Sequence, residues 1–383
     1  MRKFFDAVGK YVREADMVLL VLCLVSALYG LVLVSSASRS VSGSQVFVQV
    51  VAIVLGLLLF VLFSIIDIDV IADKYRVLIV IGLLFIASLF IFGTGEEETG
   101  NKAWLRFSFG FGIQPAEIVK VPFVIILARM LSRHRDRRMM NSVWSMTRVL
   151  LVFLAFFGLI VVSSKDLGSA LVYVFILLVM MYMGGVYLRW FALGIAAVGA
   201  SAPILWTRFL SENQKIRILV VYDPSLDPTG LGKLWHQNLS VQAIKLGRFF
   251  GSGLYKGRIT QSGIIPAQHS DFILSAAGEE FGFVGVMVIF GLLLAIIARC
   301  LYVGIKSNDK LGMLVCSGIA AMLIFQTLEN IGMCLKLTPV VGLTLPFFSY
   351  GGSSILTVFV AAGLVCGIKM RPKPARFRQI TDM

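Results

Sequence analysis

Charged side chains are scarce in this sequence, and their scarcity decides its class. Asp, Glu, Lys and Arg make up 15% of the 383 residues, whereas 58% are hydrophobic, and the mean hydropathy is +0.89. Soluble domains carry about 25% charged residues, so a pair of soluble domains is excluded. The composition predicts an all-α polytopic membrane protein in which residues 1–383 form a single integral membrane domain.

Histidine and cysteine are also few, and their spacing argues against a metal centre. The three histidines are scattered, and the five cysteines lie in or beside apolar runs without a C-x-x-C pair. This pattern is typical of small buried hydrophobes and implies neither a disulfide nor a metal. The sequence has no Walker loop, zincin motif or Ser–His–Asp order, which disfavours NTPases and hydrolases. Lys and Arg in cytoplasmic loops explain the net charge of +14, so no nucleic-acid partner is expected.

Ten apolar runs predict about ten transmembrane helices. They cover residues 17–34, 47–66, 77–92, 114 to about 133, 149–162, 168–183, 191–206, 272–302, 313–335 and 355–369. Lys and Arg are concentrated before the first run, in the link at 133–138 and after the last run, which predicts that both termini are cytoplasmic. The first run slightly resembles a signal peptide, but its length and the nine runs that follow indicate an uncleaved helix.

One long loop, about residues 208–270, separates the seventh and eighth runs and is expected outside the cell. It is far longer than a helix connection needs, and its excess of Lys and Arg points either to anionic lipid headgroups or to a site for a phosphorylated substrate. Residues 241–250 predict an interfacial helix with Lys245 and Arg248 one turn apart. The glycines that follow, with Lys256 among them, predict a re-entrant or phosphate-approaching loop.

Polar residues cluster at the expected outer face in residues 101–120, where Lys102 and Trp104 precede the fourth run and Gln114 begins it. Glu117 and Lys120 lie three residues apart on one helical face, where such a pair either stabilises the span or lines a substrate groove. Trp104 is either an interfacial belt residue or part of the same groove.

Three further polar positions lie within or between later runs. Asp166, between the fifth and sixth runs, either caps a helix or takes part in catalysis. Asn330 is a polar group within a span, expected to be satisfied by its neighbours. Pro and Gly interrupt the apolar pattern in 339–354, where backbone donors at a helix start favour an anion or a polar headgroup; the residues singled out there are Ser349, Gly351, Gly352, Ser353 and Ser354.

The stretch 264–282 carries the strongest functional signal. Asp271 stands where the long loop meets the eighth run, with His269 close by, and Glu279 and Glu280 follow on the next helix as supporting acids. An acid at the edge of hydrocarbon is expensive and indicates function. A carboxylate beside basic residues suits general-base chemistry on a hydroxyl, with cations stabilising a departing phosphate. These features predict a membrane enzyme or carrier that handles an anionic amphiphile.

Four segments resemble the SEDS family (shape, elongation, division and sporulation; RodA/FtsW-like proteins). They are Q-P-A-E-I-V-K at 114–120, K-D-L-G-S-A-L at 165–171, H-S-D-F-I-L-S-A-A-G-E-E-F-G at 269–282 and P-F-F-S-Y-G-G-S-S at 346–354. The resemblance implies an inverting glycosyltransferase that polymerises lipid II at the outer face of the bacterial cytoplasmic membrane, beside a class B penicillin-binding protein. It matches Asp271 to the essential aspartate, which would deprotonate the 4-hydroxyl of the acceptor sugar, and Trp104 to the essential tryptophan. A divalent cation, magnesium or manganese, is the candidate cofactor, and no organic cofactor is expected.

Departures from the family pattern keep other functions open. Ala267 stands where a Glu is common, and Lys165 replaces a Pro. The Ala267 departure leaves open a catalytically weak scaffold for the penicillin-binding protein, and the resemblance itself leaves open a lipid II flippase or carrier. A carrier would hold its ionisable groups near mid-membrane, whereas here they gather at one face, which favours surface chemistry. The sequence leaves elongation, division and sporulation roles undecided.

Overall fold

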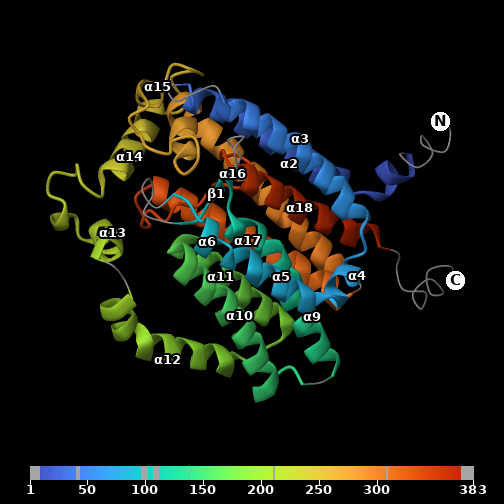
Figure 1. The fold of residues 1–383 in the computed structure, drawn as a ribbon. Helices are drawn as coiled ribbons and strands as arrows, with labels where there is room; N and C mark the ends of the chain where they lie inside the picture. The colour runs from blue at the N-terminus through green and yellow to red at the C-terminus, as the bar shows by residue number, and fades with distance from the viewer. Residues whose placement is uncertain are drawn as a thin grey trace.

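The apolar runs form a bundle of long helices, because a backbone in lipid satisfies its hydrogen bonds internally only by coiling (Figure 1). The computed structural model describes residues 9–39, 44–95, 102–106, 112–137, 139–209, 212–307 and 309–371. The main helices are α2 (Met17–Ala37), α3 (Ser44–Ile65), α5 (Tyr75–Ala87), α6 (Leu89–Phe92), α8 (Pro115–Ile118), α9 (Lys120–Asp136), α10 (Val143–Ser164), α11 (Leu167–Gly184), α12 (Leu188–Ile204), α16 (Ile273–Lys306), α17 (Lys310–Cys334) and α18 (Gly352–Met370).

Nine helical stretches in the described part are long and apolar enough to cross a membrane, which confirms the all-α polytopic class. The expected fourth span corresponds to α8 and α9, and Pro115 opens the first turn of α8. Helix α9 is 17 residues long and carries several basic residues, so it is too short and too polar to be one of these nine. A count of ten spans and the sidedness of the loops stay predictions.

The bundle is packed around α17 and α18, the spans with the largest buried share. Helix α18 packs along α3, α17 packs against α16 and α11, and α9 packs between α5 and α17. Helix α12 differs, because none of its residues is buried. It extends away from the bundle at the lower left of Figure 1 and continues into the π-helix η1 (Leu205–Phe209).

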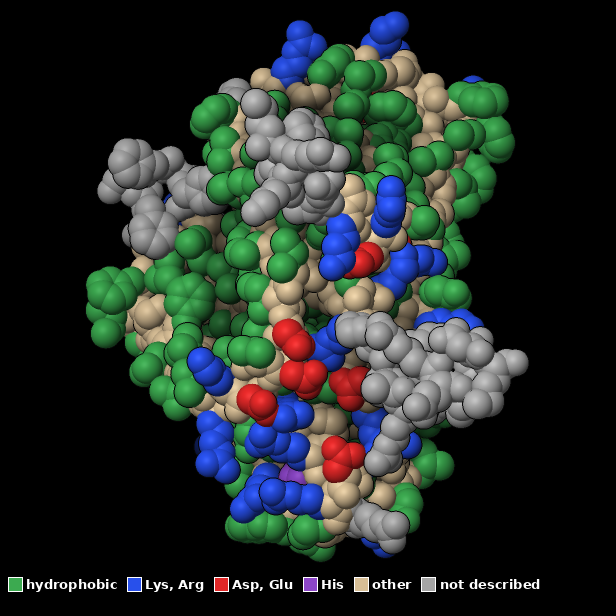
Figure 2. All heavy atoms as spheres, turned by 90° about the vertical axis from the view of Figure 1, so that its right-hand side faces the viewer, with side chains coloured by type: hydrophobic (Ala, Val, Ile, Leu, Met, Phe, Trp, Pro, Cys, Tyr) green, Lys and Arg blue, Asp and Glu red, His purple; other side chains and the backbone are tan. Residues whose placement is uncertain are grey.

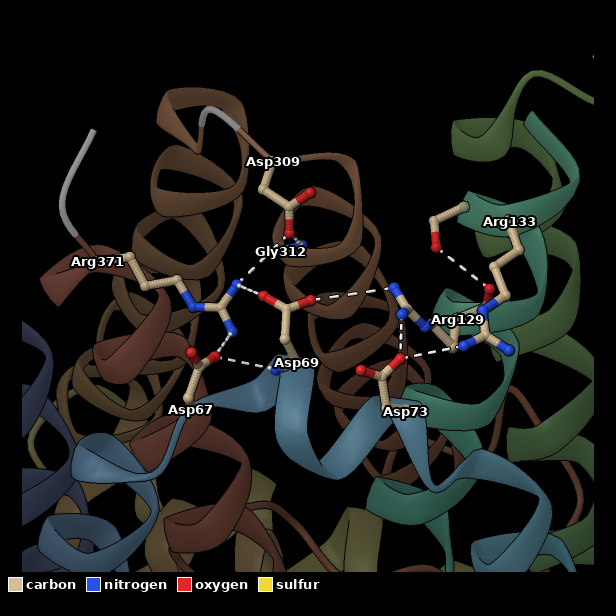
Figure 3. A network of polar contacts seen from close by, with 9 residues as sticks. Asp67, Asp69, Asp73, Arg129, Arg133, Asp309, Gly312 and Arg371 are labelled. Atoms are coloured by element: carbon tan, nitrogen blue, oxygen red, sulfur yellow. Dashed lines mark hydrogen bonds and ion pairs between the residues drawn. The ribbon is translucent and has the colours of Figure 1, made fainter. Parts of the chain in front are cut away.

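Ion pairs join the helix ends on the right-hand side of Figure 1. Short helix α4 (Ile68–Asp73) follows α3, and Arg371 just after α18 pairs with Asp67 at 2.6 Å and with Asp69 at 3.1 Å. Arg129 of α9 pairs with Asp73 of α4 (Figure 3). The face seen from this side has acidic side chains among Lys and Arg in its lower half, with hydrophobic side chains on its flanks (Figure 2). This network connects the ends of the second, fourth and last expected spans.

The long loop contains four short helices. They are α13 (Glu212–Tyr222), η2 (Pro224–Leu226), α14 (Trp235–Gly247) and α15 (Arg258–Ser262). The prediction of a helix over 241–250 was wrong in its bounds: α14 ends at Gly247, and Arg248 has a φ of 49°, so Lys245 and Arg248 are not neighbours on one helix. Helix α14 packs against α16, so part of its surface faces protein.

Gly247 and Gly251 of this loop serve close packing, whereas the expectation of a re-entrant or phosphate-approaching loop stays a prediction. A Cβ on Gly247 would lie 1.8 Å from the carbonyl oxygen of Gly278, and one on Gly251 would lie 2.1 Å from that of Glu280. Only glycine lets the loop backbone touch the first turns of α16 in this way. The loop is thereby held onto the helix that follows Asp271.

Candidate active site

A cleft of about 640 Å³ opens among the loop segments at the end of the bundle that carries α14. This volume lies within the usual range of small-molecule sites, about 300–1,000 Å³. Of the predicted site residues, the cleft is lined by Trp104, Gln114, Asp166, His269, Asp271, Gly351 and Gly352. The structure therefore brings together residues from all four polar clusters of the sequence, which lie up to about 250 positions apart.

Asp271 is half-buried in the cleft lining, and its backbone is fixed from two sides. Its N–H donates to the carbonyl oxygen of Ala267 at 2.9 Å, closing the turn before α16. Asn330 of α17 donates from Nδ2 to the carbonyl oxygens of Asp271 at 2.8 Å and of Leu343 at 2.7 Å. Asn330 thus satisfies its polar group as predicted, and it ties Asp271 to the segment 339–345.

That segment places a glycine over the carboxylate. Gly342 has a φ of +74°, and a Cβ there would lie 3.5 Å from Oδ2 of Asp271. Gly168 at the start of α11 supports the same segment, since its Cβ would lie 2.4 Å from the carbonyl oxygen of Val341. Gly168 lets the backbone approach where a side chain would clash, and Gly342 adopts a φ that favours glycine.

Burial, together with the negative charge of Asp166, raises the pKa of Asp271 to about 6, although a hydrogen bond with Ser270 opposes the shift. A carboxylate with a pKa near the working pH is a better proton acceptor than one near 4. Burial also lowers the pKa of His269, whose ring stands edge-on to Tyr350 with the centroids 5.2 Å apart. The cleft therefore contains a poised base beside a weakly basic imidazole.

Asp166 both caps a helix and lines the cleft. Its Oδ1 accepts from the N–H of Ser169 at 3.0 Å, which caps α11. Its Oδ2 accepts from Ser169 Oγ at 2.7 Å and from Gln114 Nε2 at 2.9 Å. Burial raises the pKa of Asp166, and the Ser169 hydrogen bonds oppose that shift. The predicted capping is confirmed, and a catalytic role stays a prediction.

A short hairpin carries Trp104 to the cleft. Strands β1 (Leu105–Arg106) and β2 (Gly112–Ile113) pair antiparallel, and Trp104 bridges to Thr94 just before them. A Cβ on Gly112 would lie 3.1 Å from Cε3 of the Trp104 ring, so Gly112 leaves room for the indole. The hairpin thus holds a flat aromatic surface at the cleft, in a form suited to a sugar ring.

The serine hydroxyls before and within α18 hold the protein together instead of lining the cleft. Ser349 Oγ donates to the carbonyl oxygen of Ser270 at 2.5 Å, and Ser353 Oγ accepts from the N–H of Gln114 at 3.0 Å. The hydroxyl of Ser354 lies 2.9 Å from that of Thr344. The expectation that these three serines contact a headgroup finds no support in their placement.

Several other predicted residues lie outside the cleft lining. Glu117 and Lys120 form a buried ion pair with each other, which matches the stabilising alternative. The remaining predicted binding residues that are not part of the lining are Lys102, Lys245, Arg248 and Lys256. Their prediction rested on charge and sequence spacing, and neither property determines the direction in which a side chain of the loop points.

Glu279 and Glu280 support the long loop, as their predicted structural role requires. Glu279 accepts from the N–H of Thr260 at 2.7 Å and from that of Ile259 at 2.9 Å, at the start of α15. Glu280 accepts from the hydroxyl of Ser36 at 2.8 Å. These carboxylates anchor the loop to α16 and α2.

Six polar residues of the lining were not among the predicted site residues: Arg106, Arg217, His236, Ser270, Thr344 and Tyr350. Tyr350 lies inside the recognised segment 346–354, and Arg106 stands two positions after Trp104, so proximity to a motif was the available signal. Arg217 and His236 come from the loop helices α13 and α14 and have no such signal.

The described residues do not form a ready-made metal site. Among them, no group of three or more His, Cys, Asp or Glu side chains is placed to hold a metal ion. Asp166 and Asp271 are the acidic residues that the described lining contains, and both oxygens of Asp166 already accept hydrogen bonds. The fit to a bound divalent cation is poor, so no chemical step below passes through one.

Comparison with known proteins gives one consistent result. The family model FTSW_RODA_SPOVE, described as "Cell cycle protein", matches residues 16–373. A "Probable peptidoglycan glycosyltransferase FtsW" of Geobacter sp. (strain M18) is 31% identical over 94% of this chain and 98% of its own length.

Two solved structures resemble this chain over 93% of its length. One comes from work titled "Structural coordination of polymerization and crosslinking by a peptidoglycan synthase complex", with a TM-score of 0.78, 30% identity and 97% of that chain covered. The other is the Rod shape determining protein RodA of Thermus thermophilus, with a TM-score of 0.68, 28% identity and 96% of that chain covered.

Proposed function

This chain belongs to the FTSW_RODA_SPOVE family of cell cycle proteins, and from that premise we propose how it works as a peptidoglycan glycosyltransferase. Its substrate is lipid II, which it polymerises into glycan strands at the membrane. The observation that carries the mechanism is the half-buried carboxylate of Asp271, whose pKa is raised to about 6 in a cleft of suitable size.

Asp271 acts as the general base. Its carboxylate takes the proton from the 4-hydroxyl of the acceptor sugar, and that oxygen forms a bond to C1 of the donor sugar. The bond between C1 and the diphosphate oxygen breaks, and the polyprenyl diphosphate leaves with the electron pair. Attack opposite the leaving group inverts the configuration at C1. Backbone contacts from Ala267 and Asn330 hold the base in place, which provides the positioning on which such catalysis depends.

The cleft faces outward in this proposal, at the outer leaflet of the bacterial cytoplasmic membrane. The positive-inside bias of the sequence supports this sidedness. A class B penicillin-binding protein is the proposed partner, and the similarity to a chain of a peptidoglycan synthase complex supports it. Involvement of magnesium or manganese is part of the same test.

The test compares purified wild-type protein with Asp271→Asn and with Asp223→Asn. Asp223 is an exposed acid of the same loop outside the cleft lining, so it is the matched control. Each protein receives lipid II with and without the penicillin-binding protein, and with either divalent cation or a chelator. We expect polymer from wild type and Asp223→Asn, and a loss of about 100-fold or more in Asp271→Asn.

Three outcomes decide between the functions. If folded Asp271→Asn forms polymer at the wild-type rate, Asp271 is not the general base. Absence of polymer from every protein, with the partner present, favours a carrier or a scaffold. Polymer that persists in the chelator removes the divalent cation from the mechanism.

A further inference from the structure

A second cavity of about 200 Å³ adjoins the cleft on the side of the loop helices. Its lining consists of Arg217, Gly232, Lys233, His236, Gln237 and Val340, and it shares Arg217, His236 and Val340 with the cleft. We call it the side pocket. The shared residues place the side pocket directly beside the cleft, next to any ligand that occupies the cleft.

The frame of the side pocket is fixed by buried hydrogen bonds. Gln237 on the first turn of α14 is buried, and its Nε2 donates to the carbonyl oxygens of Met333 at 2.9 Å and Thr338 at 2.8 Å. These bonds seat α14 on the end of α17. On the other side, Asp227 accepts from the N–H groups of Gly232 at 3.0 Å and Leu234 at 3.1 Å, which shapes the turn that carries Lys233.

The described lining of the side pocket carries basic side chains and no acidic one. Arg217 and Lys233 are exposed, and neither forms an ion pair within the part of the chain that the structure describes. Burial, together with the charges of Arg217 and Lys233, holds the pKa of His236 below its usual value, so the positive potential is felt inside the pocket. Unpaired cations around a hollow attract and orient an anion.

We propose that Arg217, Lys233 and His236 form an oxyanion subsite that takes an anionic group of the lipid-linked substrate while its sugar rings occupy the cleft. The inference rests on the proposed function and names the part of the substrate recognised outside the reacting centre. At about 200 Å³ the side pocket is smaller than the roughly 300 Å³ at which whole-ligand sites begin, so it suits one phosphate-type or carboxylate group. That group is either the diphosphate link or a carboxylate of the peptide.

The test measures binding separately from turnover. The parent protein is Asp271→Asn in nanodiscs, and the measurement is its affinity for a fluorescent lipid II. Into this parent we introduce either Arg217→Gln together with Lys233→Gln, or Arg258→Gln as the control. Arg258 is an exposed cation of the same loop that lines neither hollow. We expect the dissociation constant to rise about tenfold or more in the Arg217/Lys233 variant and to stay unchanged in the control. Arg217→Lys with Lys233→Arg, which keeps both charges, should restore most of the affinity.

Two further arms identify the anionic group. If the diphosphate occupies the pocket, inorganic pyrophosphate displaces the fluorescent substrate, and its inhibition constant rises about tenfold in the Arg217/Lys233 variant. If a carboxylate occupies it, pyrophosphate does not compete, and lipid II with amidated peptide carboxylates binds the parent protein as weakly as unmodified lipid II binds the variant.

Equal affinity of the Arg217/Lys233 variant and the Arg258 control overturns the subsite. Thermal melting and gel-filtration profiles that match the parent establish that these proteins are folded, and the single changes serve if the pair is unstable. If the affinity depends on these charges but the wild-type protein forms no polymer, the subsite is supported and the proposed enzymatic activity is refuted. The two failures are thereby distinguishable.

Discussion

Replacing Asp166 by Asn should move the pH dependence of polymerisation toward lower pH. A general base works in its ionised form, so a pKa of about 6 for Asp271 predicts half the maximal rate near pH 6. At pH 5 about one tenth of the carboxyl groups are ionised, and the rate should be about tenfold below its plateau. Because the charge of Asp166 raises the pKa of Asp271, its removal shifts the midpoint downward.

The structure limits the size of this shift. Burial is the main cause of the raised pKa and stays in the variant, so the midpoint should fall below 6 and remain above the ordinary value of 3.8. Relative to its own plateau, Asp166→Asn should therefore be faster at pH 5 than wild type. Asn is also a good N-cap, which keeps α11 capped.

The assay measures initial rates of glycan formation at saturating lipid II between pH 4.5 and 8 for wild type, Asp166→Asn and Asp223→Asn. The Asp223 variant, whose site is outside the cleft lining, should follow the wild-type curve. A wild-type rate that is flat between pH 5 and 7, or an Asp166→Asn midpoint at or above that of wild type, would refute the assignment of Asp271 as the titrating base.

Two substitutions test the backbone around the carboxylate. Asn330→Ala leaves the carbonyl oxygens of Asp271 and Leu343 without their donor. We expect the free energy of unfolding to fall by about 2–4 kcal/mol, seen as a lower melting temperature in detergent, and polymerisation to be reduced. An unchanged melting temperature would contradict this prediction. Gly342→Ala places a methyl group 3.5 Å from Asp271 Oδ2 at a φ of +74°. We expect the polymerisation rate to fall about tenfold and the free energy of unfolding to fall by only about 1 kcal/mol. Full activity would show that this backbone does not confine the substrate.

The long spans were predictable from sequence because an apolar run in lipid has to be helical. Their ends were less so. The fifth run was placed at 149–162, whereas α10 covers Val143–Ser164, since the polar residues of its first turns extend the helix beyond the apolar run, with Ser142 as its cap. Likewise, the bounds of α14 depend on where Gly247 meets the backbone of Gly278, a contact that local pattern does not encode.

The cleft was predictable where a polar residue interrupts an apolar pattern at a span end, as Asp271, Asp166 and Gln114 do. The serines that end as internal hydrogen-bond partners, such as Ser349, have the same sequence signal as ligand-binding serines, so pattern alone did not separate them. Arg217 was missed because its place depends on the path of the long loop, which tertiary contacts decide.

The hydrogen bonds of Gln49 constrain how the chain matures during synthesis. Gln49 is buried in α3, donates from Nε2 to the carbonyl oxygen of Ser349 and accepts at Oε1 from the N–H of Gly351, partners 300 and 302 positions later. Until the segment just before the last span is made, this amide has neither native partner, and an unpaired amide in an apolar medium is costly. The early helices therefore lack these contacts while the rest of the chain is synthesised. The bundle and the cleft are completed together once the final helix has packed against α3.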